Sequence, residues 1–185
     1  MDTMLNTSTC ILQTCGHEFH LECVNLMLKN SNDCAICRKP TSASGSIGQM
    51  PSGTMSVTHT PKPRGGGCGG YDNDGIIAIN FSFPNGKQTQ YQPNPGKRFS
   101  RGNKVAYLPW NSEGDALLER FKKAFSSGKI LVVGTSQTTG QSDLVVYGSI
   151  HLKSSQRGGV NAHGWPDPNY FHNVGEELDS QNVPK

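Results

Sequence analysis

The sequence predicts an α+β protein, in which a small zinc-binding module is followed by a mixed α+β domain. Two features of the sequence point to this fold class. Five of the six cysteines lie between Cys10 and Cys37 together with two histidines. The residues after Tyr71 alternate between strand-like and helix-like hydrophobic patterns. A chain of 185 residues has room for one such module and one domain of ordinary size.

The composition excludes several classes of function. A formal net charge of +3 is too small to indicate nucleic-acid binding by itself. No run approaches the roughly 18 apolar residues of a membrane span, and the first ten residues lack the apolar core of a signal peptide. We therefore expect a cytoplasmic protein without membrane contact, with the nucleus as the alternative location. In such a reducing compartment, clustered cysteines and histidines indicate a metal site before disulfides.

Composition also divides the chain into three segments. Residues 1–40 hold the cysteine–histidine cluster, residues 41–70 are rich in Ser, Gly, Thr and Pro, and residues 71–185 form the mixed domain. The middle segment has too little apolar surface to offset the entropy of ordering it, so we expect a flexible linker. Within it, Met55–His59 alternates between apolar and polar residues and is a candidate for one short strand.

The domain begins with a strand at Gly75–Phe83, which is rich in β-branched and aromatic residues. The turn residues Pro84–Lys87 then predict a return strand near Gln88–Tyr91.

A helix follows from Ser112 to Phe125, with Ser112 as its expected N-cap and Gly128 beyond its end. Two further strands and a final helix are predicted at Ile130–Val133, at Leu144–Ile150, and from Asp167 or Pro168 towards Leu178.

The cysteines and histidines of the first segment have the spacing of zinc ligands. Zinc takes four thiolate or imidazole ligands in a tetrahedron, and a Cys-x2-Cys pair supplies two of them from one turn. The alternative is a group of buried or redox-active thiols. The candidate ligands are Cys15, His17, His20, Cys23, Cys34 and Cys37.

This spacing resembles the C-terminal three-quarters of a RING finger, a module that holds two zinc ions. The resemblance implies that Cys15, His17, Cys34 and Cys37 share one zinc. His20 and Cys23 would bind the other, whose remaining Cys-x2-Cys pair is missing upstream.

The RING resemblance also implies that Phe19, Leu21 and Val24–Leu28 form a small core. Arg38 stands where many RING fingers contact ubiquitin and its conjugating enzyme; an ordinary solvated arginine is the alternative.

Several long phrases of the second domain resemble the Deltex family of ubiquitin ligases. They are QYQPNPGKRF (90–99), YLPWNSEG (107–114), GTSQTTGQSD (134–143), SIHLKS (149–154) and HGWPDPNY (163–170).

The resemblance implies a Deltex C-terminal domain that binds NAD or ADP-ribose and acts with the RING on ubiquitin carried by a conjugating enzyme. The implied reactions are ubiquitin transfer to lysines or to a ribose hydroxyl of ADP-ribose, and ADP-ribose transfer from NAD to the ubiquitin carboxylate. Implied partners are the charged conjugating enzyme, ubiquitin, and ADP-ribosylated or other proteins. ADP-ribosylated nucleic acid is a further candidate. Because the domain lacks a basic stripe, such a contact would come through the ADP-ribose mark or a strand end and not through broad phosphate binding. Longer members carry Notch-pathway-binding regions ahead of the RING, and we expect none in this chain.

The resemblance also assigns the groove that binds the dinucleotide. The turn after Ile130–Val133 offers backbone amides and hydroxyls to phosphate or ribose oxygens, although a plain loop is the commoner meaning of such a turn. His163 would hold the nucleotide, and Trp165, where the family usually has tyrosine, would stack on one of its rings. The expected binding residues are Ser136, Gln137, Thr138, Thr139, Gly140, His151, His163, Gly164 and Trp165.

Two residues match the family's catalytic positions. Glu177 would take the proton from a ribose hydroxyl as it attacks the thioester, and His151 would orient or polarise that hydroxyl. The family usually has a second histidine where this chain has Leu152. Two other hypotheses remain: a non-enzymatic reader of ADP-ribose with a defective RING, or an N-terminally incomplete version of a longer ligase.

Overall fold

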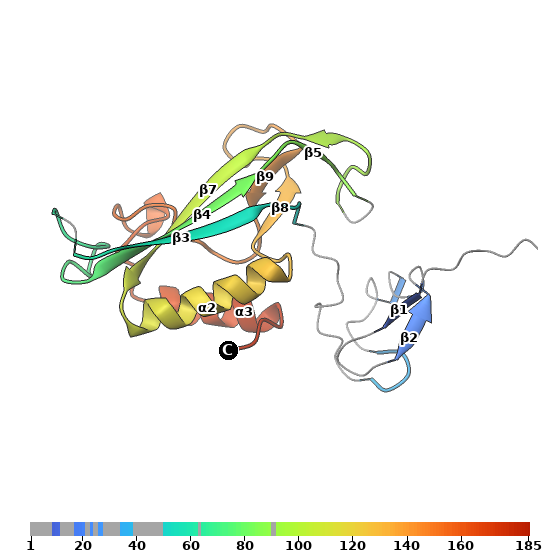
Figure 1. The fold of residues 1–185 in the computed structure, drawn as a ribbon, viewed down its shortest axis with the longest axis horizontal. Coiled ribbons are helices and arrows are strands. Elements are labelled where there is room, and N and C mark those ends of the chain that lie inside the picture. The colour runs from blue at the N-terminus through green and yellow to red at the C-terminus, as the bar shows by residue number, and fades with distance from the viewer. Residues whose placement is uncertain are drawn as a thin grey trace, which may run out of the picture. The chain divides into compact units, whose positions relative to one another are not determined.

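A computed structural model describes residues 9–11, 17–20, 23, 26–27, 34–38, 50–62, 64–89 and 92–185 (Figure 1). The chain forms two compact units, Met1–Ile47 and Gly48–Lys185. No helix among the described residues is long and apolar enough to cross a bilayer.

The first unit contains one small antiparallel sheet. Strand β1 (Thr9–Ile11) pairs with β2 (Glu18–His20), so that Cys10 lies opposite Phe19. Phe19 is half-buried, in keeping with a place in the module's core. Leu26 is 65% exposed, so its expected place in that core is wrong. Leu21, Val24, Asn25 and Leu28 lie outside the described residues.

The second unit is built on a three-stranded antiparallel sheet in the order β3-β4-β7. Its strands are β3 (Thr54–Thr60), β4 (Gly75–Phe83) and β7 (Gly102–Trp110). Two smaller two-stranded sheets join β5 (Gly86–Lys87) to β6 (Arg98–Phe99) and β8 (Leu131–Gly134) to β9 (Leu144–Tyr147).

Strand β4 has the predicted bounds and lies at the centre of the sheet. Ile77, Ile79, Phe81 and Phe83 alternate along it and are buried, because one face of the strand packs on the core. Strand β3 contains the predicted Met55–His59 strand and covers one side of β4. The compact second unit begins at Gly48, within the segment 41–70 that the composition predicts as a linker.

The first half of the predicted return strand at Gln88–Tyr91 is wrong, because Gln88 and Thr89 are in no strand, and Gln90 and Tyr91 lie outside the described residues. Just before them, Gly86 and Lys87 pair with β6 and not with β4. The partner of β4 is β7, which runs antiparallel to it over its full length. A tight turn predicts a hairpin only when the next residues continue a ladder. Here Gln88 instead buries its side chain in a loop.

Helix α2 (Ser112–Ser126) confirms the predicted helix but has a different cap. The Asn111 side-chain oxygen accepts the Gly114 amide at 3.0 Å, so Asn111 and not Ser112 is the N-cap. Gly128 ends the helix region at a φ of 72°, a conformation that favours glycine. The buried face of the helix comprises Leu117, Leu118, Phe121 and Ala124.

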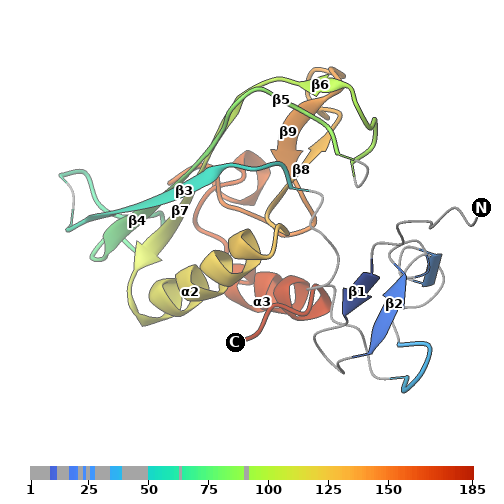
Figure 2. The ribbon, with the colours of Figure 1, turned by 45° about the vertical axis from the view of Figure 1, so that its right-hand side comes forward.

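Helix α3 (Tyr170–Ser180) begins later than predicted and buries Tyr170, Val174 and Leu178, which are spaced four residues apart. Both views of the ribbon place α2 and α3 on the same side of the central sheet (Figures 1 and 2). A short 3-10 helix, η2 (Val160–Ala162), precedes α3. Strands β8 and β9 confirm the last two predicted strands with shifted ends, β9 stopping before Gly148.

Arg120 joins the two helices. Its guanidinium is buried and donates to the Asp179 carboxylate (2.6 Å) and to the carbonyls of Val183 (2.8 Å) and Gly175 (3.3 Å). A charge removed from water needs such partners, because unpaired it would be costly to bury. Arg120 thus ties α2 to the middle of α3 at Gly175, to its last turn at Asp179, and to Val183 beyond its end.

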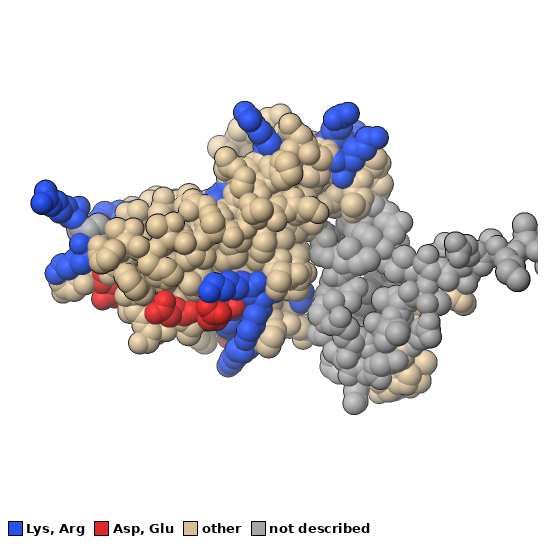
Figure 3. Space-filling model, viewed as in Figure 1, with Lys and Arg blue, Asp and Glu red and all other residues tan. Residues whose placement is uncertain are grey.

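On the outer surface, opposite charges mix over α2 (Figure 3), where Lys122 and Glu119 form an ion pair of 2.6 Å. Lys and Arg side chains gather over the β5–β6 hairpin in the same view, and there Lys87 lies opposite Arg98.

Replacing the cap of α2 tests the assignment of Asn111. We expect Asn111→Ala to lower the free energy of unfolding by about 1–2 kcal/mol, because it removes both the cap and a 2.7 Å hydrogen bond to Asp74. Ser112→Ala is the matched control and should change it by less than about 0.5 kcal/mol. Urea unfolding measures both, and a larger loss for Ser112→Ala would contradict the assignment.

Candidate functional site

Two neighbouring pockets of the second unit meet at His151, Leu152 and His163, which line both of them. The first pocket has a volume of about 280 Å³ and is bounded by α3 and η2. The second has a volume of about 420 Å³ and is bounded by β7, β9 and the turn after β8. Together they form one groove of two compartments, with His151 where the compartments meet.

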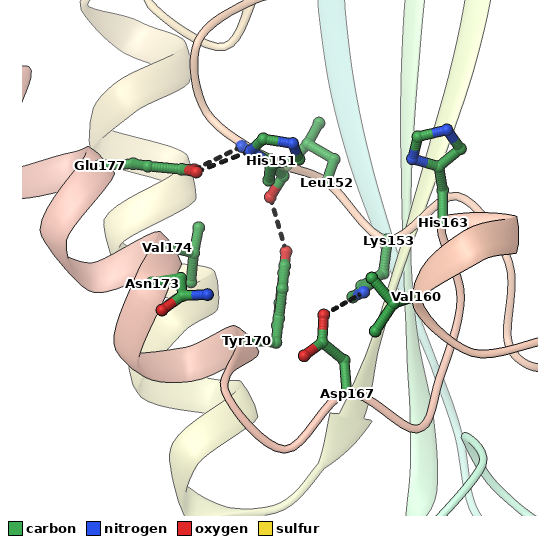
Figure 4. A pocket seen from close by; sticks show the side chains of 10 residues that line it. All are labelled: His151, Leu152, Lys153, Val160, His163, Asp167, Tyr170, Asn173, Val174 and Glu177. Carbon is green, nitrogen blue, oxygen red and sulfur yellow. Dashed lines mark hydrogen bonds and ion pairs between the residues drawn. The ribbon is translucent and has the colours of Figure 1, made fainter.

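The first pocket holds the Glu177–His151 pair (Figure 4). Glu177 points from α3 towards His151, and its two carboxylate oxygens have separate partners. One lies 2.6 Å from His151 Nδ1, and the other accepts the His151 backbone N–H at 2.7 Å. The His151 side chain is 74% exposed and that of Glu177 only 26% exposed. The carboxylate is thus held behind an imidazole that faces the groove.

A buried polar group forms the floor of this pocket. The Lys153 ammonium and the Asp167 carboxylate form an ion pair of 2.6 Å, and both side chains are largely buried. The ammonium also lies 5.0 Å from the centre of the Tyr170 ring. The Tyr170 hydroxyl donates to the His151 carbonyl at 2.8 Å. None of these floor contacts was predicted from the sequence.

The second pocket contains part of the predicted turn. Ser136, Gln137 and Thr138 line it. The turn is closed by hydrogen bonds between Ser136 and Gln141 (2.9 Å) and between Gly140 and Ser136 (2.8 Å). Thr139 and Gly140 shape this turn and line neither of the two pockets. Gly140 has a φ of 69°, a reason for glycine there that is unrelated to a ligand.

Lys104 of β7 was not predicted as a site residue, yet it lines the second pocket. Its ammonium lies 5.3 Å from the centre of the Tyr147 ring. The strand carrying it was itself missed in the sequence, so no periodic pattern could direct attention to Lys104.

Asp143 connects two of the phrases that carry the family resemblance. Its carboxylate accepts from Gln88 (2.6 Å) and Asn94 (2.9 Å), and these donors hold the pKa of the carboxyl below its ordinary value. Gln88 and Asn94, which lie between β5 and β6, are thereby fastened to the end of the turn that borders the second pocket.

Two predicted binding residues need correction. Trp165 is fully buried and its indole N–H donates to the Tyr107 carbonyl at 3.0 Å, so it cannot stack on a ligand in the groove. Gly164 is buried as well, and a Cβ there would lie 2.1 Å from the Arg157 carbonyl oxygen. Both residues support the chain beneath the groove. His163, beside them, lines both pockets.

The first unit contains a candidate metal centre. The ligand atoms of His17, Cys34 and Cys37 all lie within 4.8 Å of one another. Cys34 Sγ is 3.5 Å from His17 Nδ1. Zinc bonds of about 2.3 Å to sulfur and about 2.0–2.1 Å to nitrogen, at tetrahedral angles, would separate these atoms by about 3.6 Å. The three residues therefore fit a zinc ion.

The described ones among the other expected ligands, His20 and Cys23, do not join this group. Cys15, the expected fourth ligand, lies outside the described residues. His20 and Cys23 are described, are exposed, and are not part of the cluster.

A cysteine–histidine cluster that fits zinc, followed by an α+β domain with a groove of two compartments, defines a class of two-part proteins, and comparison with known families places the chain within it. A model of the Deltex C-terminal domain matches residues 47–183, and a model of the Ring finger domain matches residues 1–38. The chain belongs to the Deltex family.

Named relatives agree with this assignment. The chain is 35% identical over 173 residues to the human protein named "Probable E3 ubiquitin-protein ligase DTX3", a match that covers 93% of this chain and 48% of that relative. It is 36% identical over 177 residues to human "E3 ubiquitin-protein ligase DTX1" and 35% identical over 179 residues to mouse "E3 ubiquitin-protein ligase DTX4". Both of these matches cover 93% of this chain and 28% of the relative. The chain thus spans about half the length of DTX3 and less of the others.

The metal centre predicts a specific loss of zinc. Cys34→Ser should lower the zinc content of the purified protein by about one ion per chain, because it removes a buried thiolate ligand. Cys68→Ala is the matched control: Cys68 is buried in the second unit, and burial raises the pKa of its thiol to about 12, which disfavours a thiolate. Elemental analysis measures both, and equal zinc in the two variants would contradict the assignment.

Proposed function

We propose that this chain is a Deltex-type RING ubiquitin ligase. It transfers ubiquitin from a conjugating enzyme to protein substrates, to ADP-ribose or to both, and its second unit binds NAD or ADP-ribose. The observation that carries the proposal is the Glu177–His151 pair beside the point where two pockets meet. The family and the printed names of its relatives support the same activity.

The shape of the groove supports a dinucleotide-like ligand. Such a molecule has two ends joined by a diphosphate, and the groove has two compartments joined at His151 and His163. In the second compartment the hydroxyls and backbone of Ser136 and Thr138 offer hydrogen bonds to ribose or phosphate oxygens. Lys104 brings a positive charge to the same compartment. We assign His163 to holding the nucleotide where the compartments meet.

Glu177 and His151 supply the chemistry of transfer to ADP-ribose. A ribose hydroxyl attacks the carbonyl carbon of the ubiquitin thioester, a new C–O bond forms, and the C–S bond breaks to release the conjugating enzyme's thiolate. The hydroxyl proton passes to Glu177 as general base. His151, which lies 2.6 Å from the carboxylate and is open to the groove, orients and polarises the hydroxyl. The product is a ubiquitin ester of ADP-ribose.

The first unit has the task of binding the charged conjugating enzyme. A zinc ion held by His17, Cys34 and Cys37 would supply structural rigidity to this unit. Ile36, between two of these residues, is 61% exposed, and Leu26 is 65% exposed. Exposed apolar side chains beside a rigid centre suit a protein–protein contact. Partners are therefore the charged enzyme, ubiquitin, and ADP-ribosylated proteins or nucleic acid ends.

Replacing Glu177 tests the proposed chemistry. With activating enzyme, conjugating enzyme, ubiquitin, ATP and labelled ADP-ribose, Glu177→Gln should lower the rate of ubiquitin–ADP-ribose formation at least about 100-fold, since a general base is lost. Glu176→Gln is the matched control on the same helix, because the Glu176 carboxylate is exposed and forms an ion pair with His172 at 3.5 Å. Its rate should stay near that of the parent chain. Equal rates in both variants would contradict the assignment of Glu177 as general base.

Binding is tested apart from catalysis. His163→Ala should weaken the binding of ADP-ribose about 10-fold, as measured by isothermal titration calorimetry, because His163 lines both compartments. His172→Ala, an exposed histidine of α3 away from both pockets, should leave the dissociation constant unchanged. If ADP-ribose binds but no ubiquitin product forms in the preceding assay, the chain is a reader of ADP-ribose and not a ligase. If ADP-ribose does not bind, the groove has another ligand.

A further inference from the structure

We propose that Tyr170 is a positioning residue for the Glu177–His151 pair. Its phenol holds the backbone of His151 at the point where Glu177 can reach both the amide and the imidazole of that residue. This inference rests on the proposed function, because it concerns the same catalytic pair. It adds a residue that does not touch the reacting hydroxyl but acts through His151.

His151 depends on polar contacts for its position. Its side chain is 74% exposed, so packing against the core does little to hold it. It also lies beyond the end of β9, outside any strand. Its backbone N–H and C=O are both bound by side chains of α3, the N–H by Glu177 at 2.7 Å and the C=O by Tyr170 at 2.8 Å. Removing either residue's side chain leaves the His151 backbone with one hydrogen bond to α3 in place of two.

Tyr170 is well suited to serve as the fixed point. It is 3% exposed, and its ring packs against Trp165, with ring centres 5.0 Å apart. The Lys153 ammonium lies 5.0 Å from the ring centre and is itself paired with Asp167. Burial raises the pKa of Tyr170 well above its ordinary value, so the phenol keeps the proton that it donates.

Helix α3 presents Tyr170 and Glu177 together. The two residues are seven positions apart, which is about two helical turns, so they lie on the same face of one rigid element. Figure 4 shows both side chains directed from this helix towards His151. The helix thereby fixes the distance between the two groups that hold His151, the Glu177 carboxylate and the Tyr170 hydroxyl. A shift of His151 relative to α3 would have to break both contacts.

Tyr170→Phe removes the hydroxyl and keeps the ring. In the full chain we expect kcat for ubiquitin–ADP-ribose formation to fall about 10-fold, with KM for ADP-ribose changing less than twofold, because catalytic geometry and not ligand binding is lost. Tyr71→Phe is the matched control, since Tyr71 packs edge-on against the same Trp165 but has no contact with His151 among the described hydrogen bonds. It should retain the parent kcat. Calorimetric titration with ADP-ribose shows whether each variant keeps a folded groove.

A double variant separates positioning from general stability. Because Tyr170 acts through the pair, Tyr170→Phe should lower kcat little further when Glu177→Gln is already present. The inference would be overturned if Tyr170→Phe and Tyr71→Phe had equal kcat, or if Tyr170→Phe lost ADP-ribose binding. It would also be overturned if the fold losses of kcat in Tyr170→Phe and Glu177→Gln multiplied in the double variant. If Glu177→Gln alone leaves kcat unchanged, the proposed function fails instead. The two failures are therefore distinguishable.

Discussion

The buried guanidinium of Arg120 is the contact on which the site most depends. Every side chain that the first pocket takes from α3 requires that this helix be docked, and Arg120 fastens it to α2 through Asp179 and two backbone carbonyls. Helix α2 in turn packs its apolar face on the sheet, where Leu117 and Phe121 are buried. The order of dependence runs from sheet to α2, from α2 to α3, and from α3 to His151.

The groove divides its work between two kinds of structure. The compartment next to α3 is made of side chains held in fixed positions by buried contacts, such as the Lys153–Asp167 ion pair. The compartment next to β8 and β9 is bordered by an exposed turn, closed by local hydrogen bonds between Ser136 and Gln141 and between Gly140 and Ser136. Chemistry that needs exact geometry suits the first compartment, and recognition that tolerates adjustment suits the second. Among the residues that the structure describes, His151, Leu152 and His163 are common to both compartments.

Sequence patterns predicted the elements whose structure is determined by local hydrophobic patterning. The strand at Gly75–Phe83 has its expected bounds because its buried alternation is visible in the sequence. Contacts between distant residues were not visible: the pairing of β4 with β7 in place of a hairpin, and the tie between Tyr170 and His151, depend on the whole fold. Trp165 shows the same limit, since an aromatic residue in a suggestive phrase is equally suited to a core.

Within the candidate site, the resemblance directed attention to Glu177, His151 and His163, and the structure brings these three to one groove. It did not extend to Lys104, because the strand that carries it was not recognised. The N-cap of α2 was also not predictable from the sequence. Asn111 and Ser112 are both good N-cap residues, and only the backbone shows which one has the extended conformation of a cap.

The positions of the two tryptophans make the protein's own fluorescence informative. Trp110 is 39% exposed and lies against His59, with ring centres 4.9 Å apart, at the edge of the central sheet. Trp165 is fully buried beneath the groove beside Tyr170. Indole emission shifts to shorter wavelength in apolar surroundings, so the two residues emit differently. With Trp110 replaced by phenylalanine, the remaining emission would come from a single indole under the floor of the groove and would follow events there without an added label.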